Sequence, residues 1–128
     1  MKKAAVIMIV LMIAAFSLKE VSSSSVIIKG KASWYSQNDP GILLTTANME
    51  TFDDSKLTCA IWDLPFNTIL KVTNLENGKS VIVRVNDRGP AKRLYRRGRR
   101  LDLSRKAFEV LSGGHTEKGI ITVNVGAI

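Results

Sequence analysis

The clearest alternation of apolar and polar positions lies in the middle of the chain. From Ser80 to Val85 every second residue is a valine, which is the period of a strand with one face in a core. The segment from Thr68 to Thr73 is also rich in β-branched residues, and Asn77-Gly78 between the two segments is a strong hairpin signal. We therefore predict that these two segments form a β-hairpin.

Two further patterns lie near the C-terminus. Apolar residues recur at helical spacing from Asp102 to Leu111, and Gly113 and Gly114 follow. This pattern predicts a helix with Asp102 or Ser104 as its N-cap. From Gly119 to Val125 the alternation returns, which predicts a final strand.

The segment after residue 25 indicates short strands separated by turns. Val26–Ile28 and Lys31–Tyr35 are strand-like, and Asn38–Gly41 combines Pro and Gly in a turn. Six or so short strands with one or two short helices, in about 100 residues, predict a mainly β fold. The fold class we expect is a small closed six-stranded β-barrel.

The first 25 residues have the pattern of an export signal. Lys2 and Lys3 precede an apolar stretch from Ala4 to Phe16, and small residues follow. That stretch is shorter than the roughly 20 residues needed to span a bilayer, although an uncleaved membrane anchor stays open as an alternative. We expect a signal peptide in residues 1–25 and one domain in residues 26–128. The protein is then exported, periplasmic or extracellular, and it is not lipid-anchored, because no cysteine lies near the cleavage region.

Cysteine and histidine usage narrows the chemistry further. Cys59 is the only cysteine, so no disulfide can form within the chain, and we expect it to be a small buried side chain. No histidine, cysteine or carboxylate cluster has metal-ligand spacing. We expect no metal, no other cofactor and a monomeric protein.

The positive charge is concentrated in one segment. The formal net charge is +8, and the segment from Arg84 to Lys106 contains ten Lys and Arg residues against only Asp87 and Asp102. Such a stripe favours an anionic partner, although a solvated basic loop is the alternative. Outside the cytoplasm the candidates are anionic wall polymers and anionic lipid head groups, and no nucleic acid is expected.

Three stretches have residue types that a strand or turn does not need. Trp34 and Tyr35 are adjacent aromatic residues that could stack on sugar rings, although one of the two could equally pack in the core. The second stretch is a polar loop from Thr46 to Asp53 with Glu50 near its middle. The third runs from Arg84 to Pro90 and places Asp87 where a strand ends, a rigid position suited to a catalytic acid.

In their order along the chain, these motifs resemble one family. They read Gly-Lys-Ala-Ser-Trp-Tyr, Thr-Ala-Asn-x-Glu-x-Phe-Asp, Leu-Thr-x-Ala, Leu-Pro-Phe, Val-Thr-Asn-Leu-x-Asn-Gly-Lys-Ser-Val, Val-Arg-Val-Asn-Asp-Arg-Gly-Pro and Leu-Asp-Leu-Ser. The sequence is similar to the rare lipoprotein A (RlpA) family of septal-ring lytic transglycosylases from about Gly30 to Val125. The resemblance implies a double-psi β-barrel, as in expansins.

The resemblance also implies an activity and a site. The expected reaction cleaves the bond between N-acetylmuramic acid and N-acetylglucosamine in peptide-free peptidoglycan strands, and it forms anhydro-muramic acid. The family's acidic positions fall on Asp87, expected as general acid and base, and on Glu50, expected to position the substrate or stabilise charge. The expected substrate-binding residues are Trp34, Tyr35, Asn48, Asn86 and Arg88.

The chain differs from the family at three positions. Ile61 stands where the family has a histidine, and the only histidine, His115, lies elsewhere. Met49 and Ser36 each replace a glycine. An isoleucine can neither donate a hydrogen bond nor carry a proton. A non-catalytic, expansin-like protein that binds wall glycans is therefore the alternative to the transglycosylase.

Overall fold

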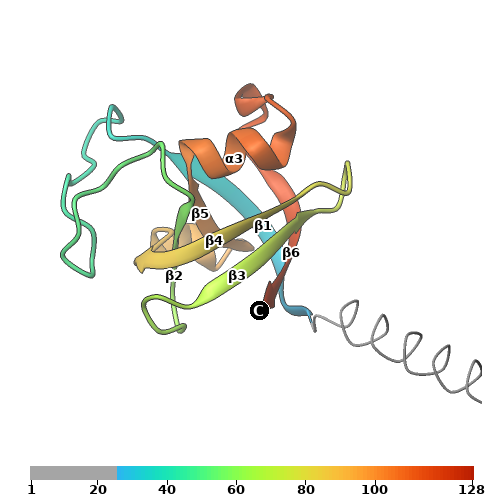
Figure 1. Cartoon of the computed structure of the whole chain (residues 1–128), viewed down its shortest axis with the longest axis horizontal. Helices are drawn as coiled ribbons and strands as arrows, with labels where there is room; N and C mark the ends of the chain where they lie inside the picture. The colour runs from blue at the N-terminus through green and yellow to red at the C-terminus, as the bar shows by residue number, and fades with distance from the viewer. Residues whose placement is uncertain (1–25) are drawn as a thin grey trace, which may run out of the picture.

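Six strands close into a barrel whose neighbouring strands are mostly not consecutive in the chain (Figure 1). The computed structural model describes residues 26–128, so the predicted signal peptide lies outside the described residues. The order around the barrel is β1-β5-β2-β4-β3-β6. The strands are β1 (Val26–Tyr35), β2 (Thr58–Ile61), β3 (Ile69–Asn74), β4 (Ser80–Asp87), β5 (Arg99–Ser104) and β6 (Ile121–Ala127). The predicted fold class, a six-stranded double-psi β-barrel, is confirmed.

Two of the strand pairs are parallel, namely β1 with β5 and β2 with β4. Parallel strands cannot be joined by a tight turn. The chain therefore makes long connections, and the longest, residues 36–57 between β1 and β2, extends to one side of the barrel (Figure 1). This connection brings the polar loop around Glu50 against the end of β4.

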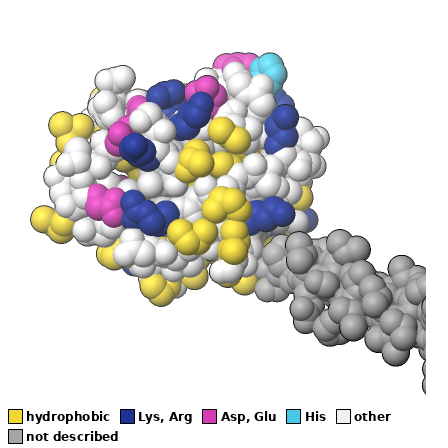
Figure 2. Space-filling view, in the orientation of Figure 1, with side chains coloured by type: hydrophobic (Ala, Val, Ile, Leu, Met, Phe, Trp, Pro, Cys, Tyr) yellow, Lys and Arg dark blue, Asp and Glu magenta, His cyan; other side chains and the backbone are white. Residues whose placement is uncertain are grey.

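The predicted hairpin is confirmed as β3 and β4. Thr73 pairs with Ser80 and Val72 with Val81, and the chain turns at Gly78, whose φ is 76°. The valines of β4 point into the core, whereas Ile82 stays 44% exposed. Figure 2 shows hydrophobic side chains gathered between basic ones on the face that carries this hairpin.

The core is filled by inward-facing residues from all six strands and from helix α3 (Arg105–Ser112). Cys59 is fully buried there, as predicted, and burial raises the pKa of its thiol to about 12. A thiol with so high a pKa is not a nucleophile at neutral pH. Among the described residues, no helix is long and apolar enough to cross a membrane.

Helix α3 packs across one end of the barrel (Figure 1). Its N-cap is Ser104, whose hydroxyl accepts a hydrogen bond from the backbone N–H of Ala107 at 3.3 Å. Asp102, the other predicted cap, lies instead in β5, a strand that the sequence analysis did not predict. The chain also forms a short helix, α2 (Lys92–Tyr95), and a 3₁₀ turn, η1 (Thr116–Lys118).

Candidate active site

Asp87 is the last residue of β4, and three donors hold its carboxylate. The backbone N–H groups of Ala47 and Arg88 donate to Oδ1, both at 2.9 Å, and the Tyr35 hydroxyl donates to Oδ2 at 3.2 Å. Backbone donors cannot change rotamer, so they fix the direction of the carboxylate. The predicted placement of an acid at a strand end is therefore seen in the structure.

Tyr35 is held beside Asp87 by packing. Its ring stacks on Phe52 with the centroids 4.4 Å apart and the planes at 3°. Burial, and then the charge of Asp87, raise the pKa of the Tyr35 hydroxyl above its ordinary value. Tyr35 therefore stays protonated and remains a hydrogen-bond donor at the site.

A hollow of about 480 Å³ opens beside these two side chains. It falls in the size range of ligand sites, roughly 300–1,000 Å³. Tyr35, Asp87 and Arg88 line it from the barrel. The loop after β1 supplies the remaining lining residues: Gly41, Ile42, Leu43, Thr45, Thr46, Ala47 and Met49. We call this hollow the cleft.

Glu50 lies beside the cleft but is not among its lining residues. The guanidinium of Arg84 donates to both carboxylate oxygens, at 2.6 and 2.8 Å, and Asn48 Nδ2 donates at 2.7 Å. These hydrogen bonds, that of Arg84 first, lower the pKa of Glu50 to about 2. Glu50 is therefore ionised at neutral pH and cannot act as the proton donor.

Glu50 and Asp87 are connected through one loop. Asn86, next to Asp87, donates from Nδ2 to Glu50 at 3.4 Å and accepts from the backbone N–H of Asn48 at 3.3 Å. Ala47 in the same loop donates to Asp87. The ion pair with Arg84 thus anchors the loop that orients Asp87.

The remaining predicted binding residues divide into two groups. Asn48 and Asn86 support Glu50, as described above. Arg88 lines the cleft, but its Nη1 donates to the carbonyls of Ile61 and Leu64 at 3.0 and 2.7 Å, and its guanidinium lies 3.9 Å over Phe66. Through these contacts Arg88 holds the segment after β4 against the end of β2 and the connection that follows it.

Trp34 does not line the cleft. Its indole N–H donates to the carbonyl of Thr116 at 3.0 Å, and its ring packs on Phe108 of α3 with the centroids 6.3 Å apart. Successive side chains of a strand point to opposite faces. The structure therefore brings Tyr35, and not Trp34, to Asp87.

The position of the family histidine is buried. The Ile61 side chain is 1% exposed and packs in the barrel core. His115, which is exposed, pairs with Glu117 near the C-terminal end of α3. Ile61 has no imidazole, and His115 is not among the residues that line the cleft.

Met49, which replaces a family glycine, has a φ of 71°. Glycine tolerates this left-handed conformation, whereas a residue with a Cβ is strained in it. The Met49 side chain is 81% exposed at the rim of the cleft. The departure from the family therefore adds strain to the loop that carries Glu50.

Asp102 also lies near the site. From the sequence it was expected at the start of the helix, but its carboxylate belongs to β5. Asp87 of β4 and Asp102 of β5 both pair with Ala60 of β2, which lies between these two strands. The two carboxylates therefore flank one small residue. The Ser33 hydroxyl donates to Asp102, and a Cβ at Gly89 would lie 3.5 Å from its Oδ2. The signal that could have revealed it is its place between the core residues Leu101 and Leu103, which is a strand pattern.

The pKa of Asp102 shifts in the opposite direction from that of Glu50. Desolvation raises the pKa of Asp102, and the charge of Asp87 adds to the rise, while Ser33 and Arg99 oppose it. Within residues 26–128, no group of His, Cys, Asp and Glu side chains is arranged to hold a metal ion.

Known proteins resemble this chain in sequence and in fold. The family described as lytic transglycolase matches residues 27–125. The RlpA of Vibrio cholerae, named an endolytic peptidoglycan transglycosylase, is 49% identical over 99 residues, which are 77% of this chain and 35% of that protein. The RlpA of Pseudomonas aeruginosa is 46% identical over 99 residues, 77% of this chain and 27% of that protein. The chain therefore spans about a third or less of these curated relatives.

Solved structures share the barrel. An expansin of Clavibacter michiganensis matches with a TM-score of 0.57 at 24% identity, over 78% of this chain and 49% of that chain. A Streptomyces papain inhibitor matches with a TM-score of 0.57 at 22% identity, over 83% and 99%. At these identities the structures show the fold alone. Because the family match covers nearly all described residues, the chain belongs to the lytic transglycolase family of double-psi β-barrels, which includes the RlpA proteins.

Proposed function

We propose that this protein cleaves peptidoglycan glycan strands between N-acetylmuramic acid and N-acetylglucosamine, as an endolytic transglycosylase. The observation that carries the proposal is the Asp87 carboxylate, fixed by backbone donors and Tyr35 at the wall of a cleft of saccharide size. The names of the curated relatives support the substrate.

In this proposal Asp87 carries the proton in both directions. As an acid it protonates the glycosidic oxygen, the bond to C1 of the muramic residue breaks, and N-acetylglucosamine leaves with its new hydroxyl. As a base it then takes the proton of the muramic C6 hydroxyl, whose oxygen bonds to C1 and closes the anhydro ring. The attacking hydroxyl belongs to the substrate, so correct orientation replaces a separate nucleophile.

The neighbouring groups assist this reaction in different ways. Glu50, ionised and paired with Arg84, holds the loop whose Ala47 N–H orients Asp87. Tyr35 donates a hydrogen bond to Asp87 when the latter is ionised. Asp102, close to Asp87, places a second carboxyl at the same face of the barrel.

The test is product release from purified peptide-free glycan strands, with anhydro-muramic fragments detected by mass spectrometry. Replacing the general acid by Asp87→Asn is expected to lower release by roughly 100-fold or more. Asp53→Asn is the matched control, because the Asp53 carboxyl bonds only within its own exposed turn, to Ser55. Undiminished release from Asp87→Asn would refute the role given to Asp87.

A second function is favoured by one observation, the buried Ile61 in place of the family histidine. In this second function the protein would bind wall glycans without cutting them. Binding of glycan strands by the wild-type protein, with no anhydro products at any pH tested, would establish this second function.

Export remains part of the proposal. The pattern of residues 1–25 supports a signal peptide, and a wall substrate requires a protein outside the cytoplasm. Cell fractionation, with and without residues 1–25, tests this, and N-terminal sequencing of the exported form locates the cleavage point. Retention of the full-length chain in the membrane fraction would indicate the uncleaved anchor instead.

A further inference from the structure

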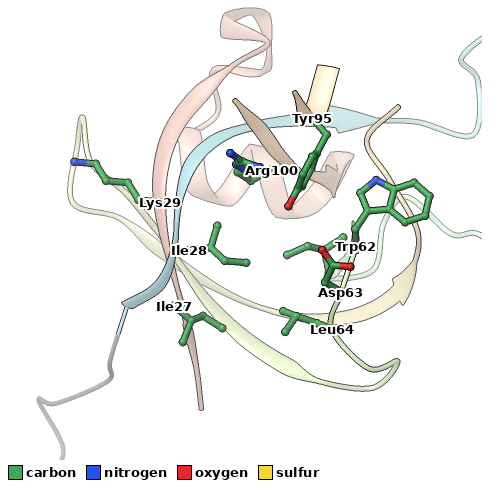
Figure 3. A pocket seen from close by; sticks show the side chains of 9 residues that line it. Ile27, Ile28, Lys29, Trp62, Asp63, Leu64, Tyr95 and Arg100 are labelled. Carbon is green, nitrogen blue, oxygen red and sulfur yellow. The ribbon is translucent and has the colours of Figure 1, made fainter. Parts of the chain in front are cut away.

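A second hollow region lies outside the cleft. Two adjoining hollows, of about 380 and 130 Å³, share Trp62, Asp63 and Tyr95 in their linings. The larger hollow is lined by the start of β1 at Ile27–Lys29, whereas the cleft lies at Tyr35, where β1 ends. Figure 3 shows Trp62 and Asp63 on one side, Ile28 on the other, and Tyr95 extending between them. We call the region lined by Trp62, Tyr95, Lys92, Arg96 and Arg100 the Trp62–Tyr95 groove.

Both aromatic rings of the groove are held in place. The Trp62 indole N–H donates to the carbonyl of Pro90 at 2.7 Å. The Arg100 guanidinium lies 4.4 Å over the Tyr95 ring. Arg100 reaches this position because Gly30 has no side chain: a Cβ at Gly30 would lie 2.3 Å from Arg100 Cγ.

Cations surround these rings without carboxylate partners. The Lys92 ammonium lies 4.9 Å over Trp62, and Arg96 lines the smaller hollow. Within the described part of the chain, no carboxylate forms a salt bridge with Lys92, Arg96 or Arg100. Asp63 is an acidic residue of the lining and is exposed. The groove therefore offers aromatic surface together with unpaired positive charge.

This combination fits an anionic sugar polymer. Aromatic faces accept the apolar faces of pyranose rings, and Lys and Arg attract carboxylates. In a peptide-free strand, each N-acetylmuramic residue ends its lactyl group in a free carboxylate, whereas an attached peptide converts that carboxylate to an amide. The charge of the strand thus reports whether the peptide has been removed.

We propose that the Trp62–Tyr95 groove binds the free lactyl carboxylates and sugar rings of peptide-free glycan strands, outside the cleft. The choice of ligand rests on the proposed function. The segment from Asp87 to Pro90 connects the two sites, because Asp87 lines the cleft and the Pro90 carbonyl anchors Trp62. The groove extends the substrate site and selects strands by charge.

The experiment measures binding of fluorescently labelled peptide-free strands by anisotropy, with the full chain carrying Asp87→Asn so that cleavage cannot affect the reading. Three variants are compared in this background: Lys92→Ala with Arg96→Ala, Tyr95→Ala, and, as control, Arg93→Ala with Arg97→Ala. The control removes the same charge from the same segment, but its residues line neither hollow. Each variant is also tested with strands whose carboxylates have been converted to amides.

We expect the Lys92 and Arg96 pair of substitutions to weaken binding of the free-carboxylate strands about fivefold to tenfold, while the control changes binding less than twofold. Tyr95→Ala is expected to weaken binding of both strand types, whereas Tyr95→Phe retains it. The difference between strand types should shrink at high salt.

Two results would overturn the proposal. The first is equal weakening by the groove substitutions and by the control, which would mean that the charge acts diffusely. The second is equal affinity of the wild-type groove for free and amidated strands. Neither result depends on cleavage. Failure of the proposed activity would be seen instead as absent anhydro products in the release assay, so the two failures can be distinguished.

Discussion

Met49→Gly tests whether the loop beside the cleft is strained. Met49 has a φ of 71° and an 81% exposed side chain, so the substitution removes strain with little loss of packing. A left-handed conformation costs a residue with a Cβ about 1–2 kcal/mol. Glycine gives back about 0.5–1 kcal/mol through the extra freedom of its unfolded chain. The net expectation is a gain of about 0.5–1 kcal/mol in the free energy of unfolding.

Urea denaturation measures this gain directly, and thermal unfolding should show a midpoint about 2–5 °C higher for a domain of this size. Met49→Ala is the control, because it removes the same side chain but keeps the Cβ that causes the strain. The reasoning is refuted if alanine stabilises the protein as much as glycine does, or if glycine destabilises it.

Three further predictions concern Glu50, Ser104 and Asp102. Glu50→Gln should destabilise the protein above pH 4.5, because the pKa of Glu50 is lowered from 4.5 to about 2 in the folded state. The loss of stability should disappear as the pH falls towards 2, and a pH-independent difference in urea unfolding would contradict this. Ser104→Ala should cost about 1–2 kcal/mol in urea unfolding, since the hydroxyl caps α3 and donates to the Lys56 carbonyl at 2.5 Å; no loss would rule out the cap. Asp102→Asn should lower release of anhydro products while leaving the protein at least as stable at neutral pH, and a clear loss of stability there would count against it.

The parts of the fold that the sequence predicted are those with local signals. The β3–β4 hairpin follows from alternating valines and Asn77-Gly78, and helix α3 from its apolar spacing and glycine end. Strand β5 was not predicted, because its first residues, Arg99 and Arg100, are charged and only Leu101 and Leu103 show the alternation. Its pairing with β1 and β2 depends on contacts distant in sequence.

The site was predictable in part for the same reason. Asp87 could be placed at a strand end from the residues around it. The pairing of Glu50 with Arg84 could not, because it depends on how the connection after β1 docks on β4. Trp34 and Tyr35 could have been separated in advance, since neighbours on a strand face opposite sides and only one could reach Asp87. The Trp62–Tyr95 groove needs β1, α2 and β5 together, which no local pattern reveals.

The two carboxylates near Asp87, those of Glu50 and Asp102, differ in what they do for the fold. Glu50 is satisfied by an arginine and amides, so its charge stabilises the fold. Asp102 is half-buried, with its pKa raised by desolvation and by Asp87 and lowered only in part by Ser33 and Arg99. A carboxyl whose folded pKa is raised loses stability as the pH rises from its ordinary pKa through the folded pKa, and the cost is absent at acidic pH, where the carboxyl is protonated in both states. Asn at 102 retains an oxygen to accept from Ser33 and avoids this cost. The expected stability of Asp102→Asn should therefore rise relative to wild type as the pH increases. If activity falls in the same variant, the ionisable group is present for its chemistry and not for the fold.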